Sequence, residues 1–400
     1  MDAMGLVNER NTRRLPYIWH DRAMKSTTVP DTPHRRRLLL VVGICWAAMF
    51  TLPCASLSSV KFPTAHSVRL ISSSGCEALW TSRTCFFMSL STENDSLSSG
   101  TVETYEHDGW SLTYRYKLAS AGYESKTPLL LIHPVGIGLS SWFWEKFFEA
   151  WQGPELYAPD LIGCGVKNGA DAWDPDKRGL SFPLGWVQGC EALLQTRIIQ
   201  GTSGLGSLPL FQRKARDCIV VCQGGLAPVG VMLAARNPST VQRLVLTSPP
   251  TWKDMTSPVP EVELSRNYAF LRSPIVAPVA FGILETRWAI EFFSNLFLFQ
   301  DKCDQRWLDL ACDEIAPESR SPVAAFNAGF CNHRSFQEEL ETLEQATLIL
   351  SGDGDRRTAK RQEYQENMRD CTMISLPGLN VLPWESPMEV VSAIKEFCYD

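Results

Sequence analysis

The chain has 400 residues, of which 44% are hydrophobic and 20% charged, a composition typical of a folded globular protein. The net charge is −6, but residues 1–92 carry 11 Lys and Arg against 5 Asp and Glu, so the remaining residues carry −12. Residues 93–400, called the body, are therefore acidic overall and lack the excess of basic residues that binds nucleic acid. We expect no nucleic-acid partner.

A basic and then apolar stretch is the first pattern along the chain. Residues 35–55 read RRRLLLVVGICWAAMFTLPCA, in which three Arg precede an apolar run that ends in Pro and small residues. This order predicts a signal peptide, because the run is shorter than the about 20 residues of a membrane span. Residues 1–34 are then a leader. A signal anchor, with residues 38–52 kept in a membrane, is the open alternative.

A Ser-rich segment, predicted as a linker over residues 56–100, comes next. Residues 56–91 contain ten Ser, three basic residues and one acidic residue, which is the composition of a transit peptide. A signal peptide followed by such a segment resembles the two-part address of algae whose plastid has extra membranes. The resemblance implies a plastid protein. The alternatives are an ER or secreted protein with a disordered linker, and a signal-anchored membrane protein.

From Thr101 onward the chain alternates predicted strands and helices. Alternating apolar and polar residues predict a strand within 110–119, and short apolar runs that end in turn residues predict strands within 127–136, 155–165, 216–225, 241–250, 346–355 and 372–380. Amphipathic or apolar patterns predict helices within 140–151, 186–199, 226–238 and 386–398. Such alternation predicts an α/β fold with a mostly parallel central sheet and helices on both faces. The aromatic residues of the first helix are expected to pack in the core.

Two long segments between these elements are predicted to lack strands. Residues 251–345 have no buried-strand run and are expected to be helical, with a helical cap at about 251–335. Residues 201–209 read GTSGLGSLP and are expected to form a surface loop.

Five motifs and the predicted cap, in this order, resemble the α/β-hydrolase fold over residues 101–400. They are HPVG (133–136), PDLIGCG (159–165), SPP (248–250), GDGD (352–355) and GLNVLPWESP (378–387). The HPVGIGLSSWFW and NVLPWES stretches look most similar to plant and algal plastid members. The resemblance implies a helical cap over an elbow, written G-x-S-x-G in active members, that presents a nucleophile.

The positions of the family's catalytic triad carry other residues in this chain. In the family, about fourteen residues separate the nucleophile from the Pro that closes the next helix, and counting back from Pro238 gives Gly224. The base of the GHxxxxE loop falls at Asn380, and no His follows His333. Only the acid position, Asp355, keeps its residue type. Without a nucleophile or an imidazole the resemblance implies that catalysis is lost. Asp355 is then expected to cap a helix or to face water, and the basic run 356–361 is expected to begin a solvated helix.

An oxyanion hole could form without the nucleophile. By position its donors are the N–H groups of Gly225 and Val135, because Pro134 has no N–H. His133 and Gln223 lie beside them in the sequence, and each has a structural alternative, since each could simply bond the backbone. A cavity with convergent donors under an aromatic cap can bind a small hydrophobic or carbonyl-containing ligand.

A second register keeps a nucleophile at Cys222. A thiolate at a helix N-terminus is reactive, and elbows of the dienelactone-hydrolase type use Cys. The base is still missing in this register unless His133 or His333 reaches the site. The structural alternative is that Cys222 is a small buried side chain at a strand end.

Three functions therefore stay open. The leading prediction is a plastid pseudoenzyme that binds a ligand or a partner. The alternatives are an active hydrolase or lyase that uses Cys222 on an ester-like substrate, and a structural or assembly factor. The thirteen cysteines are scattered and contain no CxxC pair, so we expect reduced thiols, with no metal site. No phosphate loop or dinucleotide motif appears, and we expect no cofactor.

Overall fold

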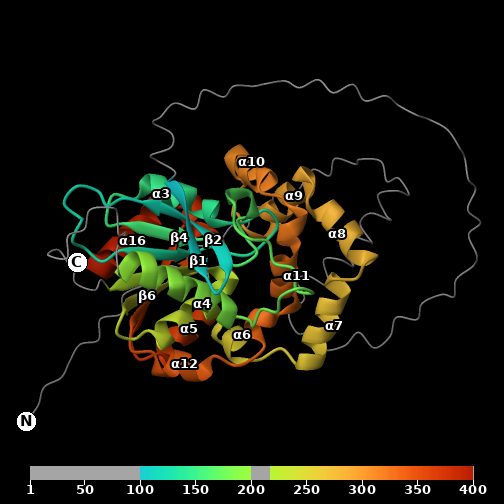
Figure 1. Cartoon of the computed structure of the whole chain (residues 1–400). Helices are drawn as coiled ribbons and strands as arrows, with labels where there is room; N and C mark the ends of the chain where they lie inside the picture. Colours follow the sequence, from blue (N-terminus) through green and yellow to red (C-terminus); the bar gives the residue numbers. More distant parts are fainter. Residues whose placement is uncertain (1–99, 200–216, 400) are drawn as a thin grey trace, which may run out of the picture. The chain divides into compact units, whose positions relative to one another are not determined.

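The computed structural model describes residues 100–199 and 217–399 (Figure 1). The predicted leader, the signal segment, nearly all of the Ser-rich linker and the loop at 201–209 lie outside these residues. The predictions for them are therefore not addressed by the structure.

One eight-stranded sheet organises the described residues. Its order is β1-β2-β4-β3-β5-β6-β7-β8, and every pair from β4 to β8 is parallel, while β1 and β2 are antiparallel. The strands are β1 Thr101–His107, β2 Trp110–Lys117, β3 Leu129–Ile132, β4 Leu156–Pro159, β5 Cys218–Gln223, β6 Val241–Thr247, β7 Ala346–Gly352 and β8 Cys371–Leu376. The predicted mostly parallel sheet is confirmed.

Helices cover both faces of this sheet, and successive residues of each strand serve two separate cores (Figure 1). In β3, Leu130 and Ile132 pack with α4 and α5, whereas Leu129 and Leu131 pack with α3 and α16. The continuous apolar runs of the sequence therefore reflect burial on two faces. The helices of these layers are α3 Glu145–Ala150, α4 Leu184–Leu193, which continues into the π-helix η3 Leu194–Ile199, α5 Ala227–Arg236 and α16 Pro387–Tyr399.

The segment between β6 and β7 forms the helical cap, as the sequence predicts. Its helices are α6 Trp252–Thr256, α7 Glu261–Leu271, α8 Val276–Leu284, α9 Arg287–Phe297, α10 Gln305–Asp313, α11 Arg320–Ala328 and α12 Gln337–Thr342. Three short helices follow β7 and β8: α13 Thr358–Arg361, α14 Glu363–Asn367 and α15 Leu382–Glu385. None of the helices in the described ranges is long and apolar enough to cross a membrane alone, although α7 and α8 together pass that test and bend by 75°.

The aromatic side chains of residues 142–148 are core residues, as expected. The five side chains are each at most 1% exposed, and they are Trp142, Phe143, Trp144, Phe147 and Phe148. Trp142 makes edge contacts with Trp307 and Trp384, at ring-centroid distances of 5.2 and 5.5 Å. This packing joins the loop after β3 to the cap helix α10 and to α15.

Candidate functional site

The carboxyl ends of the parallel strands meet at one edge of the sheet, and the predicted site residues lie in the loops there. This is where open α/β sheets bind ligands.

Gly224 is the first residue after β5 and begins the short turn η5 Gly224–Leu226 that leads into α5. Its φ is +60°, in the left-handed region, as in the strained bend that presents a nucleophile. A Cβ built on Gly224 would meet no other heavy atom within 4 Å, the outer limit of ordinary carbon contacts. The space in front of the apex of the bend, called the hollow below, is therefore open, and no side chain projects into it from Gly224.

Gly225 lies under a side chain of the cap. A Cβ built on Gly225 would be 2.5 Å from Cζ of Phe326, which comes from α11. The ring of Phe326 therefore rests against this glycine, and a Cβ at this position would require the ring to shift. The N–H of Gly225 is the second in a helical turn and has no partner within that turn.

Cys222 points away from the apex, into the core beneath α5. Its side chain is 0% exposed, and Sγ lies 2.9 Å from the carbonyl oxygen of Leu226, to which the thiol donates. Burial raises the pKa of Cys222 well above its ordinary value, which keeps the thiol protonated. A buried, neutral and hydrogen-bonded thiol is a poor nucleophile, so this placement disfavours the alternative in which Cys222 reacts.

Gln223 and Asn380 are hydrogen-bonded to each other and to the backbone. Gln223 Nε2 donates to the carbonyl oxygen of Asn380 at 2.7 Å, and its Oε1 accepts from the hydroxyl of Thr247. Asn380 Nδ2 lies 3.4 Å from the carbonyl oxygen of Phe297. The amide at the base position thus points toward the end of α9, and the Gln223 side chain is occupied by structural bonds.

The loop that holds Asn380 ties the cap to the core. The backbone N–H of Asn380 donates to the carbonyl of Leu298 at 3.1 Å. The Glu385 carboxylate accepts from the N–H of Gln300 at 2.6 Å and from that of Leu379 at 2.8 Å. In this chain the loop that would carry a catalytic base therefore fastens α9 to the sheet.

Asp355 is 8% exposed and is held by two arginines rather than facing water. Arg357 Nε lies 3.2 Å from both carboxylate oxygens, and Arg361 Nη2 lies 2.9 Å from Oδ2. This last contact is at ion-pair distance but lacks hydrogen-bond geometry. Burial alone would raise the pKa of Asp355, but the hydrogen bonds from Arg357 and the charges of both arginines outweigh it and hold the pKa below its ordinary value.

The prediction that residues 356–361 are solvated is wrong at Arg361, which is 0% exposed. Its Nε donates to the carbonyl of Pro249 and its Nη1 to the hydroxyl of Ser351, both at 2.6 Å. A buried guanidinium requires a counter-ion, and Asp355 supplies it. The acid position therefore serves a structural ion pair at the ends of β6 and β7.

His133 uses both ring nitrogens in structural bonds. Nε2 accepts from the N–H of Leu161 at 3.2 Å, so Nδ1 carries the proton and donates to the carbonyl of Pro134 at 2.8 Å. Burial lowers the pKa of His133, which favours this neutral form. His133 thus shapes the loop after β3, in which Val135 packs into the core with 7% exposure. The other candidate base, His333, bonds the carbonyl of Phe330 within the cap at 3.0 Å.

Ser248 was not predicted as a site residue, and it lies next to the bend in the sheet. It follows Thr247, which is paired with Gln223 in the ladder between β5 and β6. Its φ is +47°, a strained value for a residue other than glycine, and such strain is frequent at ligand sites. Its hydroxyl is buried and has no hydrogen-bond partner among the residues that the structure describes.

Glu314, at the end of α10, is a second titratable group at the junction of cap and core. Burial and the negative charge of Asp160 raise its pKa to about 7, against smaller opposing effects of Ser140, Arg115 and Lys167. Asp160 itself is 1% exposed and accepts from the N–H of Ser141 at 2.7 Å. Two carboxyl groups therefore face each other where the cap meets the loops after β3 and β4.

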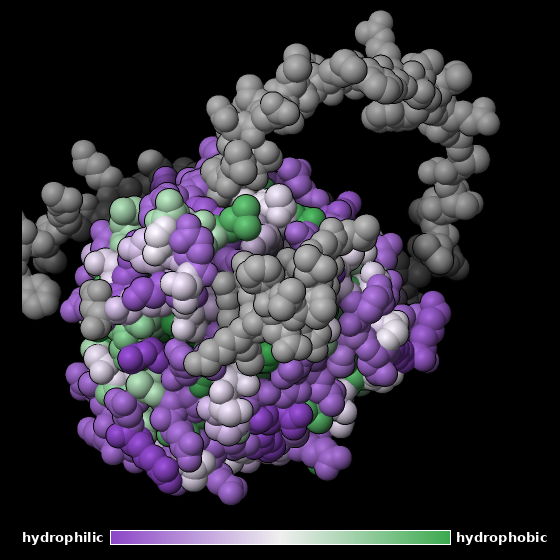
Figure 2. Space-filling model, turned by 60° about the vertical axis from the view of Figure 1, so that its left-hand side comes forward, coloured by the Kyte–Doolittle hydropathy of each residue, from purple (hydrophilic) through white to green (hydrophobic). Residues whose placement is uncertain are grey.

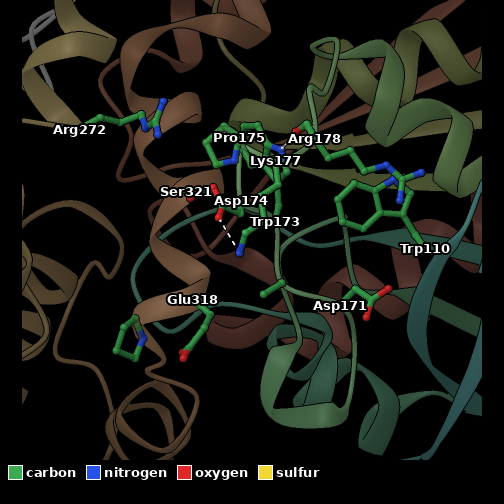
Figure 3. Close-up of a pocket in the computed structure, with 12 residues that line it drawn as sticks. Trp110, Asp171, Trp173, Asp174, Pro175, Lys177, Arg178, Arg272, Glu318 and Ser321 are labelled. Carbon is green, nitrogen blue, oxygen red and sulfur yellow. Dashed lines mark hydrogen bonds and ion pairs between the residues drawn. The ribbon is translucent and has the colours of Figure 1, made fainter.

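A separate cleft of about 500 Å³ lies between the loop 171–178 and the cap (Figure 3). Its charged side chains are mostly engaged already: Lys177 pairs with Asp174 at 3.1 Å, and Arg178 covers the ring of Trp110 at 3.9 Å. Arg272 pairs with an aspartate of the same loop.

No group of three His, Cys, Asp or Glu side chains in residues 100–199 and 217–399 is arranged to hold a metal ion. All cysteines within those two ranges are free thiols.

Three residues of the site were missed by the sequence interpretation: Phe326, Ser248 and Arg361. Phe326 lies in a helical cap with several similar aromatics, and only the folded structure brings it onto the bend. Arg361 belongs to a basic run whose other members are solvated. For Ser248, the SPP motif after a buried strand marked the position but not the strained hydroxyl.

Comparison with known proteins agrees with this architecture. Residues 129–394 match the model of a family described as the alpha/beta hydrolase family. A mutant of haloalkane dehalogenase DatA from Agrobacterium tumefaciens C58 is similar in structure, with 18% identity, a TM-score of 0.54, and coverage of 76% of this chain and 98% of that one. A hydrolase from Pseudomonas aeruginosa PA01 is similar with 17% identity, a TM-score of 0.53 and coverage of 76% and 100%.

A serine hydrolase involved in carbazole degradation has 13% identity and a TM-score of 0.54, with coverage of 74% of this chain and 98% of its own. At such identities the likeness concerns the fold alone. No curated protein matches the chain in sequence.

Proposed function

Because this chain belongs to the alpha/beta hydrolase family, we propose that it is a non-catalytic member, which binds a small carbonyl- or carboxylate-containing ligand at the bend after β5. We further propose that it does so in a plastid, to which its two-part N-terminal segment would direct it. The observation that carries the first proposal is the state of Gly224: the backbone keeps φ +60° and faces a hollow, yet no nucleophile is attached.

The surroundings of Gly224 support loss of catalysis at each further step. A general base must take the proton of the nucleophile, and the amide of Asn380 is not titratable and is bonded toward α9. The acid must orient that base, and Asp355 is instead held by Arg357 and Arg361. Cys222 is buried below the bend. Removing several members of such a triad leaves only the weak catalysis of the remaining binding groups.

The same surroundings support ligand binding. The hollow in front of Gly224 lies beside the N–H of Gly225, which has no partner in its helical turn, and close to the end of β6, where Ser248 has an unpartnered hydroxyl. Donors of this kind suit a carbonyl or carboxylate oxygen. The ring of Phe326 supplies an apolar wall. A short acyl group attached to a carboxylate fits this combination of groups.

Calorimetric titration of the full chain with butyrate, octanoate and benzoate tests the proposal. We expect at least one of them to bind, and the variant Gly225→Val to weaken that binding at least about tenfold, because its side chain would collide with the ring of Phe326 and displace this apolar wall. Gly282→Val is the matched control, since a Cβ on Gly282 meets nothing within 4 Å. Failure of all three ligands to bind, or equal binding by Gly225→Val, would contradict the proposal.

A further inference from the structure

Exposed apolar side chains are concentrated on one part of the cap. Of the nine large hydrophobic residues that are exposed in the described ranges, six lie between residues 262 and 296 and are 43–81% exposed. Ile275, Val279, Trp288, Phe292 and Leu296 belong to α8, its first flanking residue and α9, and together they are named the cap ridge. The remaining three exposed hydrophobic residues are scattered over the body.

α8 is apolar on its outer as well as its inner side. Residues 275–284 read IVAPVAFGIL and contain no polar side chain. Ala280, Phe281 and Leu284 are buried against the cap, while positions 275, 278, 279 and 282 are exposed. A helix at a protein surface normally carries polar residues on its outer face, and one that is apolar all round is covered on both sides.

α9 continues the same surface. Trp288, Phe292 and Leu296 follow one another at a spacing of four residues, which places them on one side of the helix. The rings of Trp288 and Phe292 are stacked, with centroids 5.7 Å apart. Arg287, which precedes this stripe, is engaged by Asp309 at 2.8 Å.

The cap ridge lies away from the sheet. Figure 1 shows α8 at the edge of the cap farthest from the strands. In the view of Figure 2, where the side of α16 comes forward, hydrophilic residues predominate and hydrophobic ones form small separate groups. The apolar surface of the cap is thus a local feature and not the general character of the body.

We propose that the cap ridge docks on the surface of a lipid bilayer, with α8 and α9 lying in the interface. Residues 275–284 have no ionisable side chain and therefore suit the uncharged hydrocarbon of a bilayer. Trp, present here as Trp288, is favoured at the boundary between lipid and water. The 75° bend between α7 and α8 suits helices that lie on a membrane rather than cross it. Because the ridge offers no free cation, docking depends on apolar burial and not on anionic headgroups.

The test follows amide hydrogen exchange of the full chain with and without vesicles of phosphatidylcholine. We expect exchange to slow across residues 275–297 when vesicles are present. The variant Val279→Glu/Phe292→Glu should reduce the vesicle-bound fraction at least about tenfold, since it replaces two apolar side chains that would be buried in lipid with charged ones. Leu118→Glu/Met388→Glu is the matched control, because these exposed side chains lie outside the cap.

All variants carry the same N-terminal segment, so a difference between them reports on the cap. Thermal unfolding by circular dichroism checks that each variant folds. The proposal is overturned if exchange in residues 275–297 does not slow, or if both double variants lose binding equally. It is also overturned if binding requires anionic lipid and disappears in salt. Sedimentation that shows a dimer which only the cap variant dissociates would assign the ridge to a second copy instead.

Discussion

The pair formed by Cys222 and Gly230 illustrates, at the scale of single residues, how this elbow departs from the family pattern. Where active members have a glycine before the bend, this chain has Cys222. A Cβ on Gly230 of α5 would lie only 2.8 Å from the Cβ of Cys222. The glycine that permits close packing of helix and strand is therefore on the helix in this chain.

Gly230→Ala is expected to destabilise the fold by about 1–3 kcal/mol, because neither Cβ can move without shifting the backbone. Gly282→Ala is the control: its Cβ meets nothing within 4 Å, and the change should stabilise the protein by up to about 1 kcal/mol. Urea unfolding monitored by circular dichroism measures both. Equal effects of the two substitutions would show that the contact with Cys222 does not exist.

Glu314 makes a prediction about pH. Its pKa in the folded protein is about 7, whereas an unfolded Glu has a pKa of about 4.3. Between these pH values the folded state holds more protons, so this group's contribution to stability is present at low pH and is lost as the pH rises toward 7. Glu314→Gln, which stays neutral, should therefore be more stable than the natural chain at pH 8 by about 1–3 kcal/mol, with allowance for partial exposure.

Unfolding in urea at several pH values measures this difference. At acidic pH the Glu314→Gln and natural chains should have nearly equal stability. A constant difference at every pH would assign the effect to packing and not to ionisation.

At the scale of elements, the loop after β8 has become a structural link between cap and core. Glu385 accepts two backbone N–H groups, one from Gln300 in the cap and one from Leu379 in the loop. Together with the bond from the N–H of Asn380 to the carbonyl of Leu298, this link fastens the segment after α9 to the loop after β8.

Glu385→Gln should loosen this link, because an amide accepts through a single oxygen and one of the two N–H groups loses its partner. The loss of a bond to a charged group is worth about 1.5–3 kcal/mol, so amides of residues 298–300 and 378–380 should exchange at least about tenfold faster. Glu338→Gln on the exposed side of α12 is the control and should leave exchange unchanged. Unaltered exchange in both variants would mean that other contacts hold the cap.

Most elements could be predicted from the sequence, because six of the strands are short apolar runs that end in turn residues. β1 was missed: its sequence TVETYEH buries only Tyr105, so neither an apolar run nor an alternating pattern marks it. The second half of the predicted helix at 186–199 is a π-helix, and its apolar spacing does not distinguish it from an α-helix. Local patterns identify elements that are buried on both sides better than those at an edge.

The candidate site was less predictable because its polar contacts are tertiary. Counting from Pro238 predicted that Gly224 takes the nucleophile position, and in the structure this residue has φ +60° at the bend. That Phe326 would lie over Gly225 depends on a helix distant in the sequence, and that Arg361 would be buried depends on its bond to the carbonyl of Pro249, which comes from the end of β6. No local pattern encodes such pairings.

At the scale of the whole molecule, the N-terminal segment is expected to determine where in the cell the protein is delivered. Residues 1–100, fused to a fluorescent protein, are expected to deliver it to the plastid of an alga whose plastid has extra membranes, because an apolar run is followed by a Ser-rich, acid-poor stretch. Fluorescence microscopy measures this. A fusion without residues 56–100 should stop in the ER, and delivery of the longer fusion to the ER would favour the secretory alternative.

The central claim is that no reactive group stands at the bend after β5. The most direct measurement is the rate at which the purified full chain hydrolyses p-nitrophenyl butyrate, beside Gly224→Ser, Gly224→Ser/Asn380→His and Cys222→Ser. We expect the natural chain to match the buffer blank. Neither restored variant should gain appreciable turnover, because Arg357 and Arg361 hold the acid. Hydrolysis by the natural chain that vanishes in Cys222→Ser would contradict the account.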